Sequence, residues 1–140
     1  MINKEIVKNT HILTVTKESN TLDWPLVSTE YKNIPVVYYI MYNNDVMKIG
    51  QTKNICSRFS SYRTEIGKYP EHSMPENGSW RTVKFLFEKM NVGEKAEIYA
   101  WFVKPKKQFE VHNGRKVPVT VDLDKLEKIE RKKHKPSWPY

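Results

Sequence analysis

Residues 36–63 read VVYYIMYNNDVMKIGQTKNICSRFSSYR, and this stretch decides the fold. Residues 36–41 are β-branched, aromatic or otherwise apolar, which is typical of a buried strand. Residues 43–45 are Asn-Asn-Asp, a turn sequence, and residues 46–50 return to strand composition. Two strands joined by a short polar turn predict a β-hairpin.

The segment after this hairpin predicts an amphipathic helix. Ile55, Phe59 and Tyr62 follow one another at intervals of four and three residues, so a helix would carry all of them on one face. We expect Gly50, at the end of the second strand, to give the backbone the freedom to leave the strand and enter this helix.

Further elements are predicted on both sides of this stretch. A short strand is expected at residues 11–16, a third core strand at residues 80–87, and a second helix at residues 91–103. An Asn-Gly pair within residues 109–121 predicts another hairpin, because this pair suits a tight turn with positive φ angles. Apolar residues spaced by three within residues 122–129 predict a short final helix.

The length of 140 residues predicts one domain. We expect it to consist of an N-terminal extension over residues 1–34, a core over residues 35–104, and a C-terminal hairpin with a basic helical tail over residues 105–140. The predicted fold class is α+β: a small three-stranded antiparallel sheet flanked by helices, to which the C-terminal hairpin and helix are added.

The composition indicates the kind of partner and the setting. Lysine and arginine number 24 against 16 aspartates and glutamates, and the resulting net charge of +8 favours a polyanion such as nucleic acid. The single cysteine, Cys56, excludes an intramolecular disulfide framework and a cysteine-rich zinc site. No apolar run approaches the ~20 residues that span a bilayer. We therefore expect a cytoplasmic protein with no membrane partner.

The hairpin and the helix after it closely resemble the GIY-YIG nuclease superfamily. Members of that family carry G-I-Y in the first strand, Y-I-G in the second, and an arginine eight residues after the last glycine. Here residues 36–38 are Val-Val-Tyr, residues 48–50 are Lys-Ile-Gly, and Arg58 follows Gly50 at the family's spacing. The resemblance is dense over residues 35–63, with lysine in place of the family's second tyrosine.

This resemblance implies a metal-dependent DNA endonuclease of the restriction or phage-encoded type. Phosphodiester hydrolysis needs a base for water, positive charge on the phosphate oxygens, and a metal near the leaving oxygen. Tyr38 is expected to take the proton from water, with its pKa lowered by a nearby cation. Lys48 would be that cation or share the role of base, and Arg58 would bind a non-bridging phosphate oxygen.

The metal ligand implied by the resemblance is a glutamate on the helix after the third strand. Over residues 80–103 the likeness holds in outline, and it points to Glu97 as the ligand of one Mg²⁺ or Mn²⁺ ion. One carboxylate is enough, because Mg²⁺ keeps several of its waters. Glu94, on the same face of the predicted helix, and Glu88 are the alternatives.

Double-stranded DNA is the expected partner. Tyr62 stands four residues after Arg58, which places it beside that arginine on a helix. The predicted C-terminal hairpin could enter a groove as a two-stranded ribbon. The residues that we expect to bind nucleic acid are Tyr62, Arg63, Lys53, Arg115 and Lys116. A homodimer would suit a palindromic target, but no residue indicates one.

The alternative function is a catalytically inactive nucleic-acid-binding or host-interaction protein on the same scaffold. In that case Lys48 marks the loss of activity. RNA is a second possible substrate, because phosphate contacts are alike for both nucleic acids.

Overall fold

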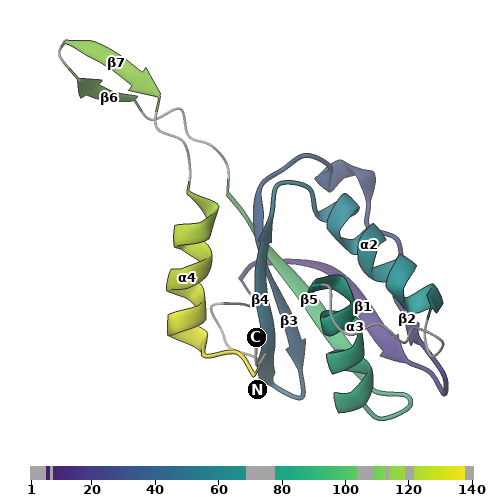
Figure 1. Cartoon of the computed structure of the whole chain (residues 1–140). Helices are drawn as coiled ribbons and strands as arrows, with labels where there is room; N and C mark the ends of the chain where they lie inside the picture. The colour runs from purple at the N-terminus through teal and green to yellow at the C-terminus, as the bar shows by residue number, and fades with distance from the viewer. Residues whose placement is uncertain are drawn as a thin grey trace.

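The centre of the fold is a five-stranded antiparallel sheet with the strand order β2-β1-β5-β3-β4 (Figure 1). The structure is a computed structural model that describes residues 6, 8–68, 78–103, 109–112, 114–118 and 122–137. The α+β class is therefore confirmed, but the sheet has five strands where three were predicted. The strands are β1 (Thr10–Lys17), β2 (Leu22–Asp23), β3 (Val36–Tyr42), β4 (Asp45–Thr52) and β5 (Lys95–Phe102).

The predicted hairpin is formed by β3 and β4, and the predicted helix after it is α2 (Ile55–Lys68). Asn43 and Asn44 make the turn with positive φ angles of 52° and 68°, which asparagine tolerates better than most residues. At the start of α2, the side chain of Asn54 accepts a hydrogen bond from the backbone N–H of Ser57. The local sequence signals therefore agree with the structure in this stretch.

The third core strand predicted at residues 80–87 is wrong, because these residues belong to helix α3 (Gly78–Lys89). Val83 and Leu86 are buried together with Met90, just beyond the end of the helix, at intervals of three and four residues. This spacing is typical of a helix. The same segment also has the alternation of apolar and polar residues that favours a strand. Packing of α3 against α2 decides between the two readings.

The helix predicted at residues 91–103 is also wrong, because strand β5 occupies most of this segment. Ala96, Ile98 and Ala100 are buried and alternate with more exposed residues, as in a strand. The strand lies between β1 and β3 and is hydrogen-bonded to both. Its partners are distant in the sequence, so the choice of strand over helix depends on tertiary pairing.

The N-terminal segment is part of the sheet and does not merely pack on a core that begins later. The strand predicted at residues 11–16 is confirmed by β1, which pairs with β5 on one side and β2 on the other. Leu13 and Val15 of β1 and Trp24 after β2 are buried in the main core. A short 3-10 helix, η1 (Thr29–Tyr31), follows before β3 begins.

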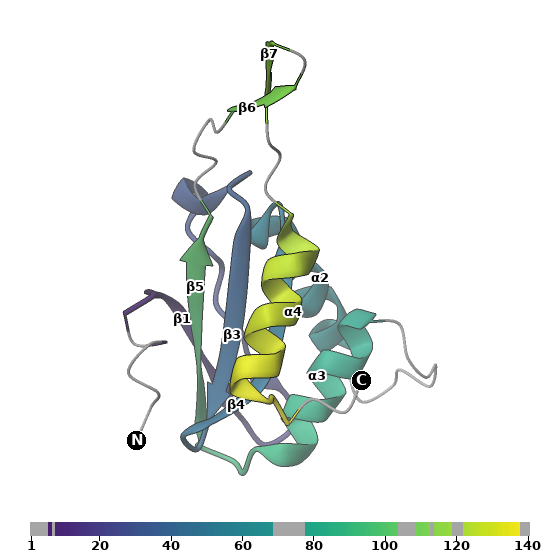
Figure 2. The same ribbon diagram turned by 90° about the vertical axis from the view of Figure 1, so that its left-hand side faces the viewer.

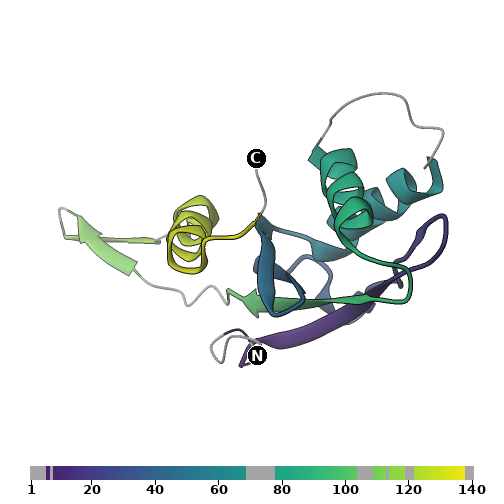
Figure 3. The same ribbon diagram turned by 90° about the horizontal axis from the view of Figure 1, so that it is seen from below.

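Helices cover the sheet unequally. Helices α2 and α3 lie on one face of the sheet (Figure 3). There Tyr38 and Ile40 of β3 pack with residues of both helices. On the other face, Tyr39 of β3 and Ile49 of β4 pack with Leu123 of helix α4 (Leu123–His134). This last helix runs alongside the edge strand β4 (Figures 1 and 2). Helix α4 therefore lies on one face of the sheet beside the edge strand β4, and α2 and α3 lie on the opposite face.

The added C-terminal hairpin and helix are both present. Strands β6 (Phe109–His112) and β7 (Arg115–Pro118) pair with each other and lie apart from the main sheet (Figure 2). Gly114 has a positive φ of 75° at the turn, and Asn113 lies outside the described residues. The predicted helix at residues 122–129 is confirmed and extends to residue 134, with the side chain of Asp122 capping its start. Among the residues described here, no helix combines the length and the apolar character needed to cross a membrane.

Gly50 has a different role from the expected one. It lies inside β4, directly opposite Tyr38 of β3, and not at the exit from the strand. A Cβ atom at this position would overlap Cζ and Oη of the Tyr38 side chain. The missing side chain therefore makes room for the tyrosine ring, and the glycine serves packing more than backbone freedom.

Replacing Gly50 by alanine is expected to lower the free energy of unfolding by about 1–3 kcal/mol, because the added methyl group overpacks the ring of Tyr38. Urea denaturation measures this change. Tyr38→Leu supplies the control, since leucine lacks the overlapping atoms and the cost of Gly50→Ala should shrink in that background. Equal costs in both backgrounds would contradict the contact.

Candidate active site

Tyr38 and Tyr62 form the buried floor of the site. Their hydroxyl oxygens lie 2.7 Å apart, and the two residues are only 2% and 1% exposed. Phe59 of α2 packs edge-on against the ring of Tyr38 and stacks on that of Tyr62. Burial raises the pKa of Tyr38 well above its usual value of 10.0, and the nearby Arg58 offsets this only in part. The lowered pKa expected for Tyr38 is therefore wrong, and the phenol stays protonated near neutral pH.

Lys48 lies on the same face of the sheet as Tyr38. It pairs with Ile40 of β3, two residues along from the Tyr38–Gly50 pair, so the side chains share that face. Its Nζ donates a hydrogen bond to Oγ1 of Thr82 at 2.6 Å and lies 5.8 Å from the ring centre of Tyr62. Burial, together with the charge of Arg58, lowers the pKa of Lys48 from 10.5 to about 8.

Arg58 provides the exposed cation of the site. It lies in the first turn of α2, one turn before Tyr62, and its side chain is exposed to solvent. Its charge acts on the pKa values of both Tyr38 and Lys48, so it lies within electrostatic range of both side chains. The structure therefore brings together Tyr38, Lys48 and Arg58, which sequence reasoning also selected.

A carboxylate that sequence reasoning missed lies beside these residues. Glu127 of α4 is half-buried, and the positive charges of Lys48, Arg58 and Arg131 act on it. Burial nevertheless raises its pKa above the usual value of 4.5. The signal that could have found it is its place four residues after Leu123, next to the apolar stripe that docks α4 on the sheet.

Glu97 does not join this site. It lies on β5 opposite Met41, whose side chain points to the sheet face away from that of Tyr38 and Ile40. Its carboxylate is hydrogen-bonded to His11 at 2.6 Å and to Thr14 at 2.5 Å. The helix that was expected to carry Glu97 to the site is a strand, and the alternation of a strand turns the side chain away.

The two alternatives to Glu97 are also placed elsewhere. Glu94 lies in the turn before β5, where its carboxylate accepts hydrogen bonds from Tyr42 and from the backbone N–H of Asn91. Those hydrogen bonds lower its pKa. Glu88 is an exposed residue near the end of α3. Neither is among the groups whose charges act on Lys48.

The residues expected to bind nucleic acid have varied placements. Tyr62 is buried in the tyrosine pair, so its ring is not a surface for stacking a base. Arg63 is exposed, but its guanidinium donates a hydrogen bond to the backbone carbonyl of Trp24. Lys53 is exposed directly after β4. The side chains of Arg115 and Lys116, in β7, lie outside the described residues.

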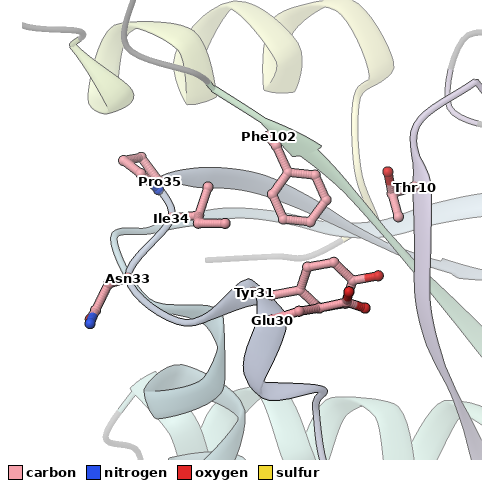
Figure 4. A pocket seen from close by; sticks show the side chains of 7 residues that line it. All are labelled: Thr10, Glu30, Tyr31, Asn33, Ile34, Pro35 and Phe102. Carbon is pink, nitrogen blue, oxygen red and sulfur yellow. The ribbon is translucent and has the colours of Figure 1, made fainter.

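A separate pocket of about 550 Å³ lies near the start of β3 (Figure 4). Tyr31 and Phe102 stack in its wall with their ring centres 5.1 Å apart. The carboxylate of Glu30 and the apolar lining make this pocket unsuited to a phosphate. Its lining residues are Thr10, Glu30, Tyr31, Asn33, Ile34, Pro35 and Phe102, which include no member of the site described above.

Two solved structures are similar to this chain over most of its length. One is a mutant of bacteriophage T4 EndoII, with a TM-score of 0.62, 19% sequence identity, and coverage of 97% of this chain and 94% of that chain. The other is the restriction endonuclease HPY188I in complex with product DNA, with a TM-score of 0.52, 18% identity, and coverage of 94% and 78%. The chain has a GIY-YIG nuclease-like fold. No protein-family model and no curated protein matches the sequence.

The GIY-YIG nuclease-like fold leads to a prediction about Lys48, whose amine the fold buries at the site. Its lowered pKa means that the unfolded chain binds more protons than the folded chain between pH 8 and 10.5. The free energy of unfolding should therefore rise with pH across this window, by up to about 3 kcal/mol.

Lys48→Met removes this contribution. The variant should be more stable than the wild type at pH 7, and its advantage should shrink as the pH approaches 10. Urea denaturation of both proteins at a series of pH values measures the difference. A difference that does not change with pH would show that the charge of Lys48 costs nothing in the folded state.

Proposed function

We propose that this chain is a metal-dependent DNA endonuclease that hydrolyses phosphodiester bonds, of the restriction or phage-encoded type. The observation that carries the proposal is the convergence of Lys48 from β4, Arg58 from α2 and Glu127 from α4 beside the buried Tyr38–Tyr62 pair. A base, a cation and a carboxylate at one place are the groups that this hydrolysis needs. The likeness to two endonucleases supports the same reaction.

Lys48 is the base in this proposal, and Tyr38 is not. With a pKa of about 8, Lys48 is neutral in roughly one tenth of the molecules at pH 7, so an unprotonated amine is present under ordinary conditions. The phenol of Tyr38 is protonated and buried, and its hydrogen bond to Tyr62 holds the Tyr62 side chain in place. Water would therefore lose its proton to Nζ of Lys48.

Arg58 binds the phosphate in this proposal. Its guanidinium is exposed, always charged, and shaped to donate two hydrogen bonds to neighbouring phosphate oxygens. The transition state gathers negative charge on those oxygens, so a fixed cation beside them lowers the barrier. Its closeness to Lys48 also helps to keep the amine unprotonated.

The donor set fits Mg²⁺ or Mn²⁺ held by Glu127. Burial raises the pKa of this carboxylate, and a divalent cation would offset the lost hydration of its charge. Within the residues that the structure describes, no group of three or more His, Cys, Asp and Glu side chains is placed to hold a metal. Mg²⁺ accepts a single carboxylate, because it keeps waters and binds substrate phosphate oxygens. When bound, the ion would neutralise charge on the leaving oxygen.

Double-stranded DNA is the proposed substrate. The net charge of +8 favours a polyanion, and the restriction endonuclease with a similar fold is a complex with product DNA. Several lysines of α4 are exposed, on the helix that also carries Glu127. Contacts from such side chains to the DNA backbone are independent of base sequence and weaken with salt. These exposed lysines are Lys125, Lys128, Lys132 and Lys133.

Glu127→Gln is expected to reduce cleavage of supercoiled plasmid in Mg²⁺ by at least about 10²-fold, because the amide removes the charge that holds the metal. Glu97→Gln is the matched control: it makes the same change on the opposite face of the sheet and should leave cleavage close to wild type. Gel analysis of nicked and linear products, with and without EDTA, measures both variants.

Loss of cleavage in Glu97→Gln, with cleavage kept in Glu127→Gln, would move the metal to Glu97 and contradict the placement of the site. Intact plasmid with the wild-type protein, together with salt-sensitive DNA binding, would favour the alternative of a catalytically inactive nucleic-acid-binding protein.

The rate of cleavage is expected to rise with pH and to level off above about 8, because only the neutral amine of Lys48 accepts a proton. Lys48→Arg should lose this rise as well as most of the activity, since a guanidinium stays protonated throughout the range. Initial rates from pH 6 to 9.5 at fixed Mg²⁺ measure the profile. A wild-type profile that is flat between pH 6 and 9 would exclude Lys48 as the base.

A further inference from the structure

Thr82 of α3 connects Lys48 to the buried tyrosine pair. It is only 1% exposed, and its Oγ1 accepts the hydrogen bond from Nζ of Lys48 at 2.6 Å. The same hydroxyl also lowers the pKa of the Tyr62 phenol, and that phenol is in turn hydrogen-bonded to Tyr38. A continuous chain of polar groups therefore leads from Lys48 into the core.

The direction of these hydrogen bonds limits what Thr82 can do for Lys48. In the bond to Lys48 the direction is set, because Nζ donates and Oγ1 of Thr82 accepts. A hydroxyl oxygen has two lone pairs for such bonds. The hydroxyl of Thr82 therefore serves Lys48 as an acceptor.

An acceptor of this kind orients the amine. A neutral lysine amine has two N–H bonds and one lone pair in tetrahedral arrangement, so fixing one N–H on Thr82 restricts where the lone pair points. An N–H bond occupies the side of Nζ that faces Thr82, so the lone pair points away from the threonine. The lone pair is therefore kept for a proton donor on another side of Nζ.

We infer that Thr82 is a positioning residue that holds the amine of Lys48 with its lone pair turned toward the attacking water. The inference rests on the proposed function, in which Lys48 is the base. It adds a residue from α3, a helix that supplies no group to the chemistry described above. The threonine touches neither substrate nor metal in this view and acts only through Lys48.

Other charged and titratable groups also face Lys48 and must stay unchanged in a test. Arg58 and Tyr62 face it from α2, and Glu127 and Arg131 face it from α4. Substitution at Thr82 leaves all of these side chains in place. A changed proton affinity of Lys48 would then be traceable to the lost hydroxyl.

Two variants separate orientation from mere packing. Thr82→Val keeps the shape of the side chain and removes the acceptor, whereas Thr82→Ser keeps the hydroxyl and removes a methyl group. The full-length variants are compared with wild type in single-turnover and steady-state cleavage of plasmid DNA with Mg²⁺ from pH 6 to 9.5. The pKa of Lys48 is measured separately by NMR of lysine labelled with ¹³C at Cε.

Thr82→Val is expected to lower kcat by about tenfold or more with little change in KM, because the amine loses its fixed direction. Its pH profile should level off at a lower pH, since a charged amine without its acceptor releases its proton more readily. NMR should show the same downward movement of the Lys48 pKa. Thr82→Ser should restore kcat and the pKa.

Two results would overturn the inference: a Lys48 pKa and a kcat in Thr82→Val equal to those of wild type, or a Thr82→Ser variant as impaired as Thr82→Val. The second result would mean that the methyl group matters for packing and the hydroxyl does not. Failure of the proposed function is distinguishable, because the wild type itself would then leave DNA intact. If the wild type leaves DNA intact, an unchanged Lys48 pKa in Thr82→Val would still contradict the hydrogen bond between Lys48 and Thr82.

Discussion

The contact on which the site depends is the ring of Tyr38 lying against the Cα of Gly50 on the neighbouring strand. Any larger residue at position 50 would take the place of the ring. The same ring carries the hydroxyl that meets Tyr62, and it packs against Phe59 of α2. The helix is therefore set against the sheet through this tyrosine, and Arg58 is brought near the edge strand as a consequence.

Burial has a common effect on the titratable groups of the site. It raises the pKa of Tyr38, Tyr62 and Glu127 and lowers that of Lys48, so each is moved toward its neutral form. The charge of Arg58 adds to this effect at Lys48 and opposes it at Tyr38 and Glu127. Lys48 has a pKa of about 8, so it can exchange its proton in mild conditions.

Much of this arrangement could be predicted from the sequence where the determining contacts are local. The hairpin, α2 and the spacing from Gly50 to Arg58 depend on neighbours within a few residues. The segments at α3 and β5 carry patterns compatible with both helix and strand. Packing against α2 decides the state of α3, and pairing with β1 and β3 decides that of β5. For Glu127 the sequence offers only its place beside the apolar stripe of α4, because its relation to Lys48 exists only once α4 has docked beside β4. The cytoplasmic setting stays a prediction.

The pairing of β1 with β5 joins two segments that are far apart in the sequence, since Thr10 is opposite Ala100. During synthesis β1 must wait for β5, and at about 5–20 residues per second the wait lasts on the order of 5–18 s. Throughout that time β1 has an unpaired edge, with which strands of other nascent chains could associate. Contacts so distant in sequence also slow folding. Expression yield should therefore depend more on temperature and chaperone supply than is usual for a domain of this size.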